Sequence, residues 1–577
     1  MENGGIVTED NAIPSLFGSG ERCDFFYRIR DTTEISKWRS QLIDRVMREY
    51  RTRDLPRVRT MVDLGIVLLR EIGRTLALIY GDPETTRDET RASPDPHAER
   101  VLKRLQPYRG FGCKTQDSDK FVGSVSDFLP PNFRVLLCES LSAHGQNVCR
   151  EDDALCDKCA IRNFCSTYRR AEAARQEGSG APTVVDLFAG AGGSSEGFRR
   201  AGFRVILAVD RDPIALRTYW LNHPGLADDR ICECDVRERK PGSLRRLVGG
   251  GKVDVLIGSP PCQGFSHAGF RARRTRTDYR VSSDERNYLF ESMISAASEL
   301  RPKLFLMENV PGMHSARQQN LSFIEHAGRI LEQKCRYSTA IWRLNASAFG
   351  VPQDRIRYFL VASTGAMPPQ PEEEYQDTSR RDFDVDALPP ITFGEAVFDL
   401  PQRKAGVGCA IDCWNPGQSS ANSRYRRYLA KFSLIRNIPV IYNHAARPHN
   451  ERDLQLYSTL RPGENSVHAV EKYGRQDLMR YRRDIFDDKY ARLREDRPSK
   501  TIVSHLAKDG NGYIHPSQVR SITVREAARV QSFHDEYAFC GSVSHQWTQV
   551  GNAVPPLLAE AIARSFMRVL KKSNGHK

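Results

Sequence analysis

The chain has 577 residues, of which 40% are apolar and 27% charged, a globular composition long enough for two or three domains. Its start lacks the basic and apolar regions of a secretory signal, and no later apolar run could span a bilayer, so we expect a cytoplasmic protein without a membrane partner. The formal net charge of +14 and the pI near 9.2 favour a polyanion, above all nucleic acid, as partner.

The first feature along the chain is a cysteine cluster in the stretch HGQNVCREDDALCDKCAIRNFC. It contains Cys149, Cys156, Cys159 and Cys165, with six, two and five residues between successive members. Four thiolates this close in a polar segment can enclose one metal centre, either tetrahedral zinc or a four-iron cluster. Without a secretory start, the 14 cysteines of the chain do not indicate a disulfide framework.

This asymmetric spacing resembles the iron–sulfur cluster loop of the endonuclease III family of DNA glycosylases. The resemblance extends back through VSDFLPPNFRVLLCESLSAHG to DPHAERV, where Asp95, His97 and Arg100 are spaced like the segment around that family's catalytic aspartate. The stretch LLREIGRT at 68–75 stands where the family has a Leu-Pro-Gly-Val-Gly hairpin, and it lacks the catalytic lysine. The resemblance implies a reduced, all-α helix-hairpin-helix domain over residues 1–177, with a structural 4Fe-4S cluster, or zinc as the alternative.

A flexible linker composition, RQEGSGAP, predicts a domain boundary near residue 178. The following stretch, TVVDLFAGAGGSSEGFRRAGFRVILAVDRDP, has the pattern strand, Gly-rich turn, helix, strand, which predicts the first βαβ unit of a doubly wound, Rossmann-like sheet. Asp210 at the end of the second strand has the position of a ribose-binding acid, and Asp235 at the end of a third could contact an adenine. Phe188 before the turn could lay its ring against a small purine cofactor.

Three later strand ends carry reactive or charged side chains. The stretch VDVLIGSPPCQGFSHAG places Cys262 between two prolines and a Gln-Gly pair, just after an apolar strand. A second apolar run, RPKLFLMENVPGM, ends at Glu308, whose carboxyl could stay protonated in a low-dielectric pocket and act as an acid. In ASAFGVPQDRIRYFLVA, Gln353, Arg355 and Arg357 alternate before a strand and therefore share one face.

Together these stretches resemble, in sequence and in order, the motifs of the DNA (cytosine-5) methyltransferases. DLFAGAGG resembles the first cofactor motif, GSPPCQGFS the nucleophile motif, ENV and QDRIR the sixth and eighth, TVREAARVQSF the ninth and QVGNAVPP the tenth. The resemblance implies an α/β methyltransferase domain over residues 178–577. Its catalytic core would cover about 181–369 and 500–577, and a smaller target-recognition domain about 370–499.

The resemblance also implies the chemistry. Cys262 would attack carbon 6 of a cytosine, forming a covalent adduct, and Glu308 would hold and protonate ring nitrogen 3. Arg357, with Arg355 beside it, would steady the pyrimidine and the nucleophile. Carbon 5 would then take the methyl group of S-adenosylmethionine, on a base flipped out of the duplex. The residues expected to bind that cofactor are Phe188, Gly190, Gly192, Gly193, Asp210, Asp235, Pro261, Asn552 and Val554.

An arginine-rich stretch after the nucleophile, SHAGFRARRTRTDYR, resembles the family's closing loop over the flipped base. The residues expected to contact DNA are Gln263, Ser266, Arg271, Arg273, Arg274 and Arg276. In TVREAARVQSF, Thr523 and Glu526 have the spacing of a helix capping box, and the family suggests that Arg525 and Arg529 organise the recognition domain.

The leading hypothesis is a cytoplasmic, nucleoid-associated enzyme that acts as a monomer on duplex DNA. It would belong to a restriction–modification pair, with a separately acting endonuclease, or be an orphan methylase. One rival is an RNA cytosine-5 methyltransferase, and another is a DNA-binding regulator with an inactive methyltransferase fold, against which the intact Cys262, Glu308 and Arg357 speak. A bifunctional methyltransferase and glycosylase is a third alternative.

Overall fold

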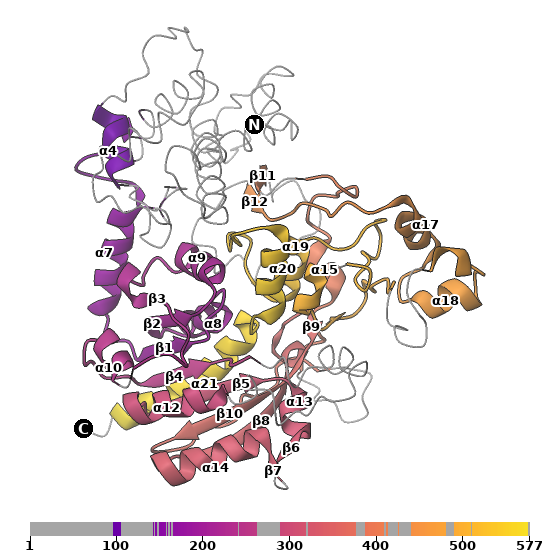
Figure 1. Ribbon diagram of the computed structural model, residues 1–577. Coiled ribbons are helices and arrows are strands. Elements are labelled where there is room, and N and C mark those ends of the chain that lie inside the picture. Colours follow the sequence, from indigo (N-terminus) through magenta and orange to yellow (C-terminus); the bar gives the residue numbers. More distant parts are fainter. Residues whose placement is uncertain are drawn as a thin grey trace, which may run out of the picture. The chain divides into compact units, whose positions relative to one another are not determined.

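The computed structural model describes residues 96–104, scattered positions between 142 and 162, and most of the chain from residue 165 onward (Figure 1). The described ranges from there are 165–240, 242–261, 289–318, 321–376, 387–408, 411–413, 425, 440–479, 490–508 and 510–574. The chain forms two compact units, Met1–Cys165 and Ser166–Lys577. Within these described ranges, no helix is both long enough and apolar enough to cross a membrane.

In the first unit, helix α4 (Pro96–Arg104) holds the segment that contains the first cysteine of the predicted cluster. Arg100 donates hydrogen bonds to the carbonyl oxygens of Gly145 (2.8 Å) and Cys149 (3.1 Å). Arg104 donates to the carbonyl of Arg150 (2.9 Å) and approaches the Cys149 sulfur at 3.2 Å. Most of the predicted N-terminal domain lies outside the described residues, so its all-α, glycosylase-like fold stays a prediction.

A seven-stranded sheet forms the centre of the second unit (Figure 1). Its strands are β1 (Thr183–Leu187), β2 (Arg204–Asp210), β3 (Ile231–Glu233), β4 (Val255–Gly258), β5 (Leu304–Asn309), β8 (Ser338–Asn345) and β10 (Ile356–Ser363). Their order is β3-β2-β1-β4-β5-β10-β8. The first five are mutually parallel, and β10 pairs antiparallel with both β5 and β8. This confirms the predicted doubly wound α/β fold.

One face of the sheet is covered by α10 (Ser243–Leu247), α12 (Phe290–Leu300) and α14 (Phe323–Cys335). Alternate strand residues, such as Val185, Leu187 and Phe305, point into a core with the apolar residues of these helices, as strand periodicity requires. Helix α14 begins at a complete capping box, in which Ser322 accepts from the backbone of Glu325 and the Glu325 carboxylate accepts from that of Ser322.

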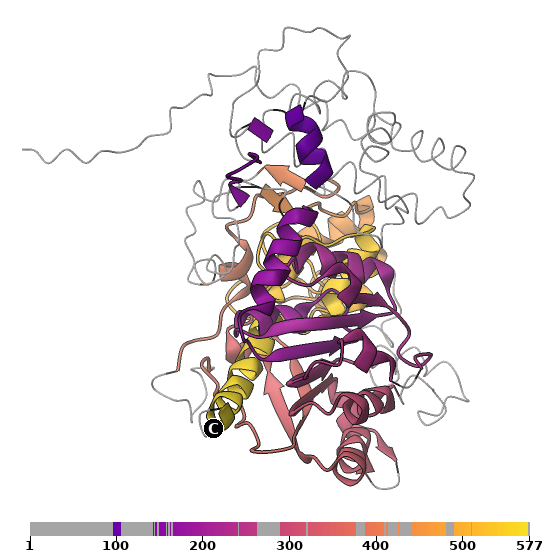
Figure 2. The same cartoon turned by 90° about the vertical axis from the view of Figure 1, so that its left-hand side faces the viewer.

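The other face is covered by α8 (Gly193–Arg200) and by the long C-terminal helix α21 (Pro556–Asn574), which crosses the sheet in Figure 2. The two helices pack so closely at Gly197 that a Cβ there would lie 2.5 Å from the Ala559 side chain. Phe566 of α21 lies edge-on to Phe198 of α8 and to Trp342 of β8. The C-terminal segment is therefore an integral part of the sheet domain.

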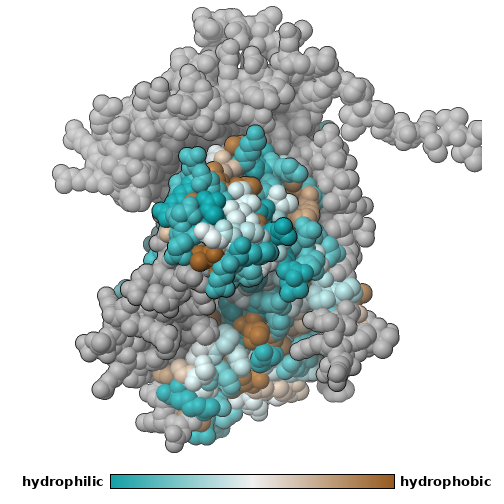
Figure 3. Space-filling view, turned by 90° about the vertical axis from the view of Figure 1, so that its right-hand side faces the viewer, coloured by the Kyte–Doolittle hydropathy of each residue, from teal (hydrophilic) through white to brown (hydrophobic). Residues whose placement is uncertain are grey.

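Between β10 and α21 the chain builds a smaller lobe, seen from its outer side in Figure 3, where hydrophilic residues predominate. Its helices are α15 (Phe393–Val397), α17 (Glu451–Thr459) and α18 (Ser466–Glu471), with 3-10 turns η9 (Gln476–Leu478) and η10 (Ser504–Ala507) and strands β11 (Ile411–Cys413), β12 (Val440–Tyr442) and β13 (Ser499–Lys500). A local core around Leu456, Tyr457, Leu478 and Tyr490 joins α17, α18 and η9.

The remaining elements connect these layers. They are α7 (Ser166–Glu177), α9 (Pro213–Asn222), η4 (Asp228–Arg230), α13 (Pro311–Ser315), β6 (Arg317–Gln318), β7 (Leu321–Ser322), η7 (Ala346–Phe349), β9 (Gln353–Asp354), α19 (Val524–Val530) and α20 (Val543–Asn552). Helix α7 is anchored to the sheet domain by Arg169, whose guanidinium lies 4.2 Å from the centre of the Trp220 ring and donates to the Trp220 carbonyl.

Helix α19 links the sheet domain to the smaller lobe through buried arginines. It starts at the predicted capping box between Thr523 and Glu526, which the structure confirms. Arg525 donates to the Tyr442 carbonyl (2.8 Å), and Arg529 to the Ala396 carbonyl (2.9 Å), so both tie α19 to the predicted recognition region. Because both guanidiniums are at most 1% exposed, these bonds fix the helix in one position.

Candidate active site

The Gly-rich turn after β1 is shaped by three glycines, each for a different reason. Gly190 has a positive φ of 53°, and a Cβ there would meet nothing within 4 Å, so this side of the turn is open to a ligand. At Gly192 a Cβ would lie 2.4 Å from the His223 ring, and at Gly193 it would lie 2.3 Å from the Val554 carbonyl. The structure therefore places the Val554 backbone beside the turn.

Phe188 and Asp210 fix the two ends of this turn. Phe188 has φ 56°, a left-handed conformation that costs a phenylalanine about 1–3 kcal/mol and is typical of ligand sites. The Asp210 carboxylate accepts a hydrogen bond from the Gly190 backbone N–H (2.8 Å), and burial raises the pKa of Asp210. The turn and the end of β2 thus form one polar edge.

Asp235 and Asn552 lie at the margins of this edge. Asp235 follows β3 and is half-buried, and the guanidinium of Arg237 pairs with it at 2.6 Å and lowers its pKa to about 2. Asp235 is therefore a carboxylate that can still accept from an adenine amino group. Asn552 is the exposed last residue of α20, next to the segment that leads to Val554.

A buried polar chain under the turn was missed from the sequence. Tyr219 of α9 donates to the Ser195 hydroxyl (2.7 Å), which donates to the Asp186 carboxylate (2.6 Å). All three side chains are at most 1% exposed. Burial raises the pKa of Asp186 to about 7. The only sequence signal was an acidic residue inside an otherwise apolar strand.

Glu308 and Arg357 meet because β10 runs antiparallel to β5. Glu308 stands opposite Phe359, near the end of β5, so Arg357 at the start of β10 reaches the same edge of the sheet. The Arg357 Nε lies 2.8 Å from a Glu308 carboxylate oxygen, and the side chains are only 10% and 12% exposed. This pair combines a carboxyl group and a cation in a site largely shielded from water.

Asn309 connects this pair to the turn that follows β4. Its side-chain amide donates to the Pro260 carbonyl (3.4 Å), and its amide oxygen accepts from the Val310 backbone. Pro261, the last described residue of this turn, is half-buried. Asn309 is the central residue of the ENV stretch, and nothing in the sequence indicated this contact.

Arg355, two residues before Arg357 and between β9 and β10, contacts a different set of partners. Its guanidinium donates to the carbonyl oxygens of Ile502 (2.7 Å), Gly551 (3.1 Å) and Ala553 (3.1 Å), and the residue is 2% exposed. Gln353 similarly donates to Gln531 (2.9 Å). In this structure Arg355 thus holds the C-terminal segment against the sheet and does not share the contacts of Arg357.

Several predicted site residues lie outside the described residues. They are Cys262, Gln263, Ser266, Arg271, Arg273, Arg274 and Arg276. Cys262 follows the end of β4 by four positions in the chain.

Comparison with known proteins identifies the family of the chain that carries this site. The C-5 cytosine-specific DNA methylase family matches residues 182–568, more than half of the chain. The chain belongs to this family. This DNA cytosine-5 methylase is 33% identical over 446 residues to the type II methyltransferase M.AgeI of Thalassovita gelatinovora, covering 66% of the chain and 98% of M.AgeI. It is 34% identical over 393 residues to M1.HphI of Haemophilus parahaemolyticus, covering 67% and 87% of the respective chains.

A solved structure shows the same fold. A candidate DNA modification methyltransferase encoded within an E. coli prophage superposes with a TM-score of 0.51 and 25% identity, covering 68% of the methylase and all of that chain. The methyl donor expected for the family is S-adenosylmethionine. The open side of Gly190, the strained Phe188 and the Asp210 carboxylate fit such a ligand.

The four predicted metal ligands of the methylase are all described, and the structure does not gather them. Cys149 and Cys156 are half-buried, and Cys159 and Cys165 are buried. In the described part of the chain, no three His, Cys, Asp or Glu side chains are placed to hold one metal ion. As arranged here, the cysteines do not fit a cluster.

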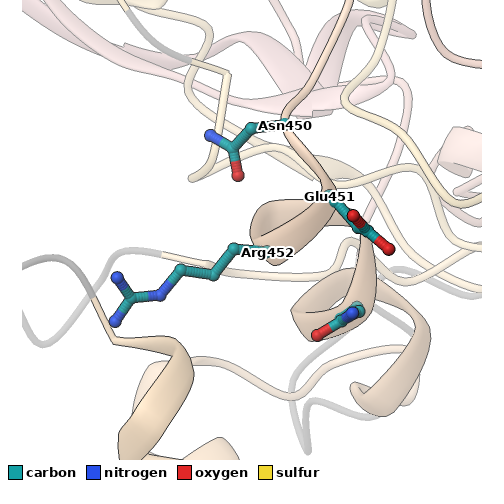
Figure 4. Close-up of a pocket in the computed structure, with 4 residues that line it drawn as sticks. Asn450, Glu451 and Arg452 are labelled. Carbon is teal, nitrogen blue, oxygen red and sulfur yellow. The ribbon is translucent and has the colours of Figure 1, made fainter.

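An open hollow of about 510 Å³ lies at the start of α17, in the smaller lobe (Figure 4). It is lined by Asn450, Glu451, Arg452 and Gln455. Arg452 reaches away from Glu451 and donates to the carbonyl oxygens of Asp477 and Met479, so these bonds already engage its guanidinium. The hollow is remote in the chain from every predicted catalytic residue.

The two histidines of the stretch NHAARPHN, in the predicted recognition region, make contacts inside the methylase. His444 is fully buried, with Nε2 2.7 Å from the Pro401 carbonyl and Nδ1 2.9 Å from the Thr523 hydroxyl. Burial lowers the pKa of His444 to about 4, so it is neutral and Nε2 donates. His449 is half-buried, with Nε2 3.0 Å from the Ser521 hydroxyl. Both residues join the smaller lobe to the segment before α19.

Proposed function

We propose that the enzyme methylates carbon 5 of cytosine within a specific duplex DNA sequence through a covalent adduct at Cys262. The observation that carries this proposal is the shielded Glu308–Arg357 pair, joined through Asn309 to the turn that leads to Cys262. A carboxyl group, a cation and a thiol at adjacent strand ends are the groups that addition to a pyrimidine ring requires.

In the proposed mechanism the Cys262 thiolate adds to carbon 6 of the base. Glu308 binds ring nitrogen 3 and delivers a proton there, so the electrons pushed into the ring are not left as a bare negative charge. Arg357, held at 2.8 Å by Glu308, steadies both the carboxyl group and the pyrimidine. Addition makes carbon 5 nucleophilic, and loss of its proton after methylation expels Cys262.

The proposed cofactor site is the edge formed by Phe188, the Gly190–Gly193 turn and Asp210, with Asp235, Pro261, Asn552 and Val554 at its margins. When bound there, S-adenosylmethionine supplies an electrophilic methyl group on its sulfonium. One oxygen of the Asp210 carboxylate accepts from the Gly190 N–H and the other from the Asp212 N–H, both at 2.8 Å, and each oxygen keeps a second lone pair that can accept from a ribose hydroxyl. Arg355 would act on this site through the carbonyls of Gly551 and Ala553.

The target base must leave the stack, since carbon 6 cannot meet a thiol inside a duplex. We assign Gln263 and Ser266, and the arginines at 271, 273, 274 and 276, to contacts with the displaced base and the phosphates. Residues 370–499 would read the sequence. The relatives are named type II methyltransferases, which supports a role as the modification enzyme of a restriction–modification system or as an orphan methylase.

Transfer of labelled methyl groups from S-adenosylmethionine tests the substrate class. We expect label in duplex DNA and none in transfer RNA, and bisulfite sequencing of the product would give the target site. Label in transfer RNA alone would favour the RNA methyltransferase, and label in neither would favour the inactive regulator.

We also propose the N-terminal region, residues 1–177 in the sequence prediction and Met1–Cys165 as a compact unit in the structure, as a separate domain with a metal centre bound by the four cysteines. This proposal is supported by the spacing of the cysteines and by the hydrogen bonds of Arg100 and Arg104 to Cys149. Because no three His, Cys, Asp or Glu side chains among the described residues are placed to hold one metal ion, metal binding would have to be coupled to local folding. Anaerobically purified protein should contain about four irons per chain, with visible absorbance that Cys156→Ala abolishes. Zinc alone would exclude the iron–sulfur cluster, and no metal would overturn the proposal.

A further inference from the structure

The Gly-rich turn is held from a second side, by a residue far away in the chain. The hydroxyl of Tyr537 donates to the carbonyl oxygen of Ala191, in the middle of the turn. The same hydroxyl oxygen lies beside Gly192, where a Cβ would be 2.9 Å from it. Tyr537 is fully buried, and burial raises the pKa of its phenol, so it remains a donor.

A hydroxyl can position a turn only if its own backbone is fixed, and that of Tyr537 is. Arg525 of α19 donates to the Tyr537 carbonyl at 2.6 Å. The Tyr537 ring packs at 4.6 Å from Phe533 and 5.5 Å from Phe539, measured between ring centres. The hydroxyl therefore has one accessible position.

The two residues after Tyr537 are clamped by asparagine side chains from opposite sides. Asn222 of α9 donates to the Ala538 carbonyl (2.9 Å) and accepts from its backbone N–H (3.1 Å). Asn443, next to β12 in the predicted recognition region, makes the same reciprocal pair with Phe539, both bonds at 3.0 Å. Each amide thus replaces a strand partner, and both asparagines are buried.

From these contacts we propose that Tyr537 is a positioning residue for the cofactor site: its hydroxyl holds the Gly190–Gly193 turn in the shape that S-adenosylmethionine binds. This inference rests on the proposed cofactor site. Without the hydroxyl, the turn samples other shapes, and the cofactor must select the competent one, which weakens its apparent affinity. Asn443 and Arg525 connect the predicted recognition region to the segment Tyr537–Phe539. The position of the turn therefore depends on contacts with the region proposed to read DNA.

The test is Tyr537→Phe, which removes one oxygen atom. Equilibrium binding of S-adenosylmethionine to the full-length protein should weaken by about 5- to 20-fold, since the Ala191 carbonyl loses its buried partner. In methyl transfer to bulk genomic duplex DNA, KM for the cofactor should rise by a similar factor, while kcat stays within about twofold.

The matched control is Tyr337→Phe. Tyr337 is also buried (5% exposed) and donates to a backbone carbonyl, that of Pro302 (2.6 Å), just before the amino end of β5. Both variants should lose thermal stability to a similar extent, but Tyr337→Phe should bind the cofactor as the wild type does. The inference would be overturned if Tyr537→Phe bound S-adenosylmethionine as tightly as the wild type, or if both variants lost the same amount of affinity for it. A wild type that binds no S-adenosylmethionine would instead refute the cofactor site itself.

Discussion

Alanine in place of Cys262 abolishes methyl transfer, lowering the single-turnover rate by more than about 10⁴-fold. The thiolate is the group that makes carbon 5 nucleophilic, and neutral water is too weak a nucleophile to replace it. Binding of S-adenosylmethionine should be unchanged, because the variant leaves the turn after β1 intact. The measurement is transfer of labelled methyl to duplex DNA under single-turnover conditions, beside equilibrium binding of the cofactor.

A covalent readout separates loss of the nucleophile from loss of folding. DNA in which the target cytosine carries fluorine at carbon 5 cannot lose a proton there, so the wild type should remain attached to it through Cys262. The alanine variant should form no such complex. The control is Cys335→Ala, at the half-buried end of α14, which should transfer methyl and trap DNA normally. An attached complex with the alanine variant at 262 would show that another residue is the nucleophile.

The parts of the fold that the sequence predicted correctly are those encoded by neighbouring residues. The β-branched run before the Gly-rich turn, the capping box at Thr523 and the polar ends of β2 and β5 each depend on a few consecutive positions. The family resemblance gave Glu308 and Arg357 roles on the same base but predicted no contact between them; the antiparallel register of β10 is the physical reason that they meet.

The contacts that the sequence could not predict join residues far apart in the chain. Tyr537 reaches a turn some 346 positions earlier, and Arg355 reaches carbonyls 147 to 198 positions later. Nothing local distinguishes these side chains from ordinary buried aromatics or from exposed arginines. Their partners are backbone carbonyls, which carry no sequence signature. Arg355 was expected beside Arg357 at the active site, and its bonds to the C-terminal segment could not be predicted from the sequence.

Glutamine in place of Glu308 should lower methyl transfer by about 10²- to 10⁴-fold, the usual contribution of a positioned general acid. The amide keeps the size of the carboxyl group and an oxygen that can accept from Arg357, so the geometry of the 2.8 Å contact can persist. The glutamine amide cannot deliver a proton to ring nitrogen 3. Addition of the thiolate therefore leaves an uncompensated negative charge in the ring. Trapping of fluorinated DNA, which also needs that addition, should slow by a similar factor.

The chain offers a closely matched control for this substitution. Glu299 at the end of α12 pairs with Arg239, and these side chains are 12% and 8% exposed, nearly as shielded as Glu308 and Arg357 at 12% and 10%. Because α12 ends just before β5 begins, Glu299 lies near the amino end of the strand whose carboxyl end holds Glu308. Glu299→Gln should therefore cost similar stability but leave methyl transfer within about twofold of the wild type. A Glu308→Gln enzyme within about tenfold of wild type would mean that another group protonates the base.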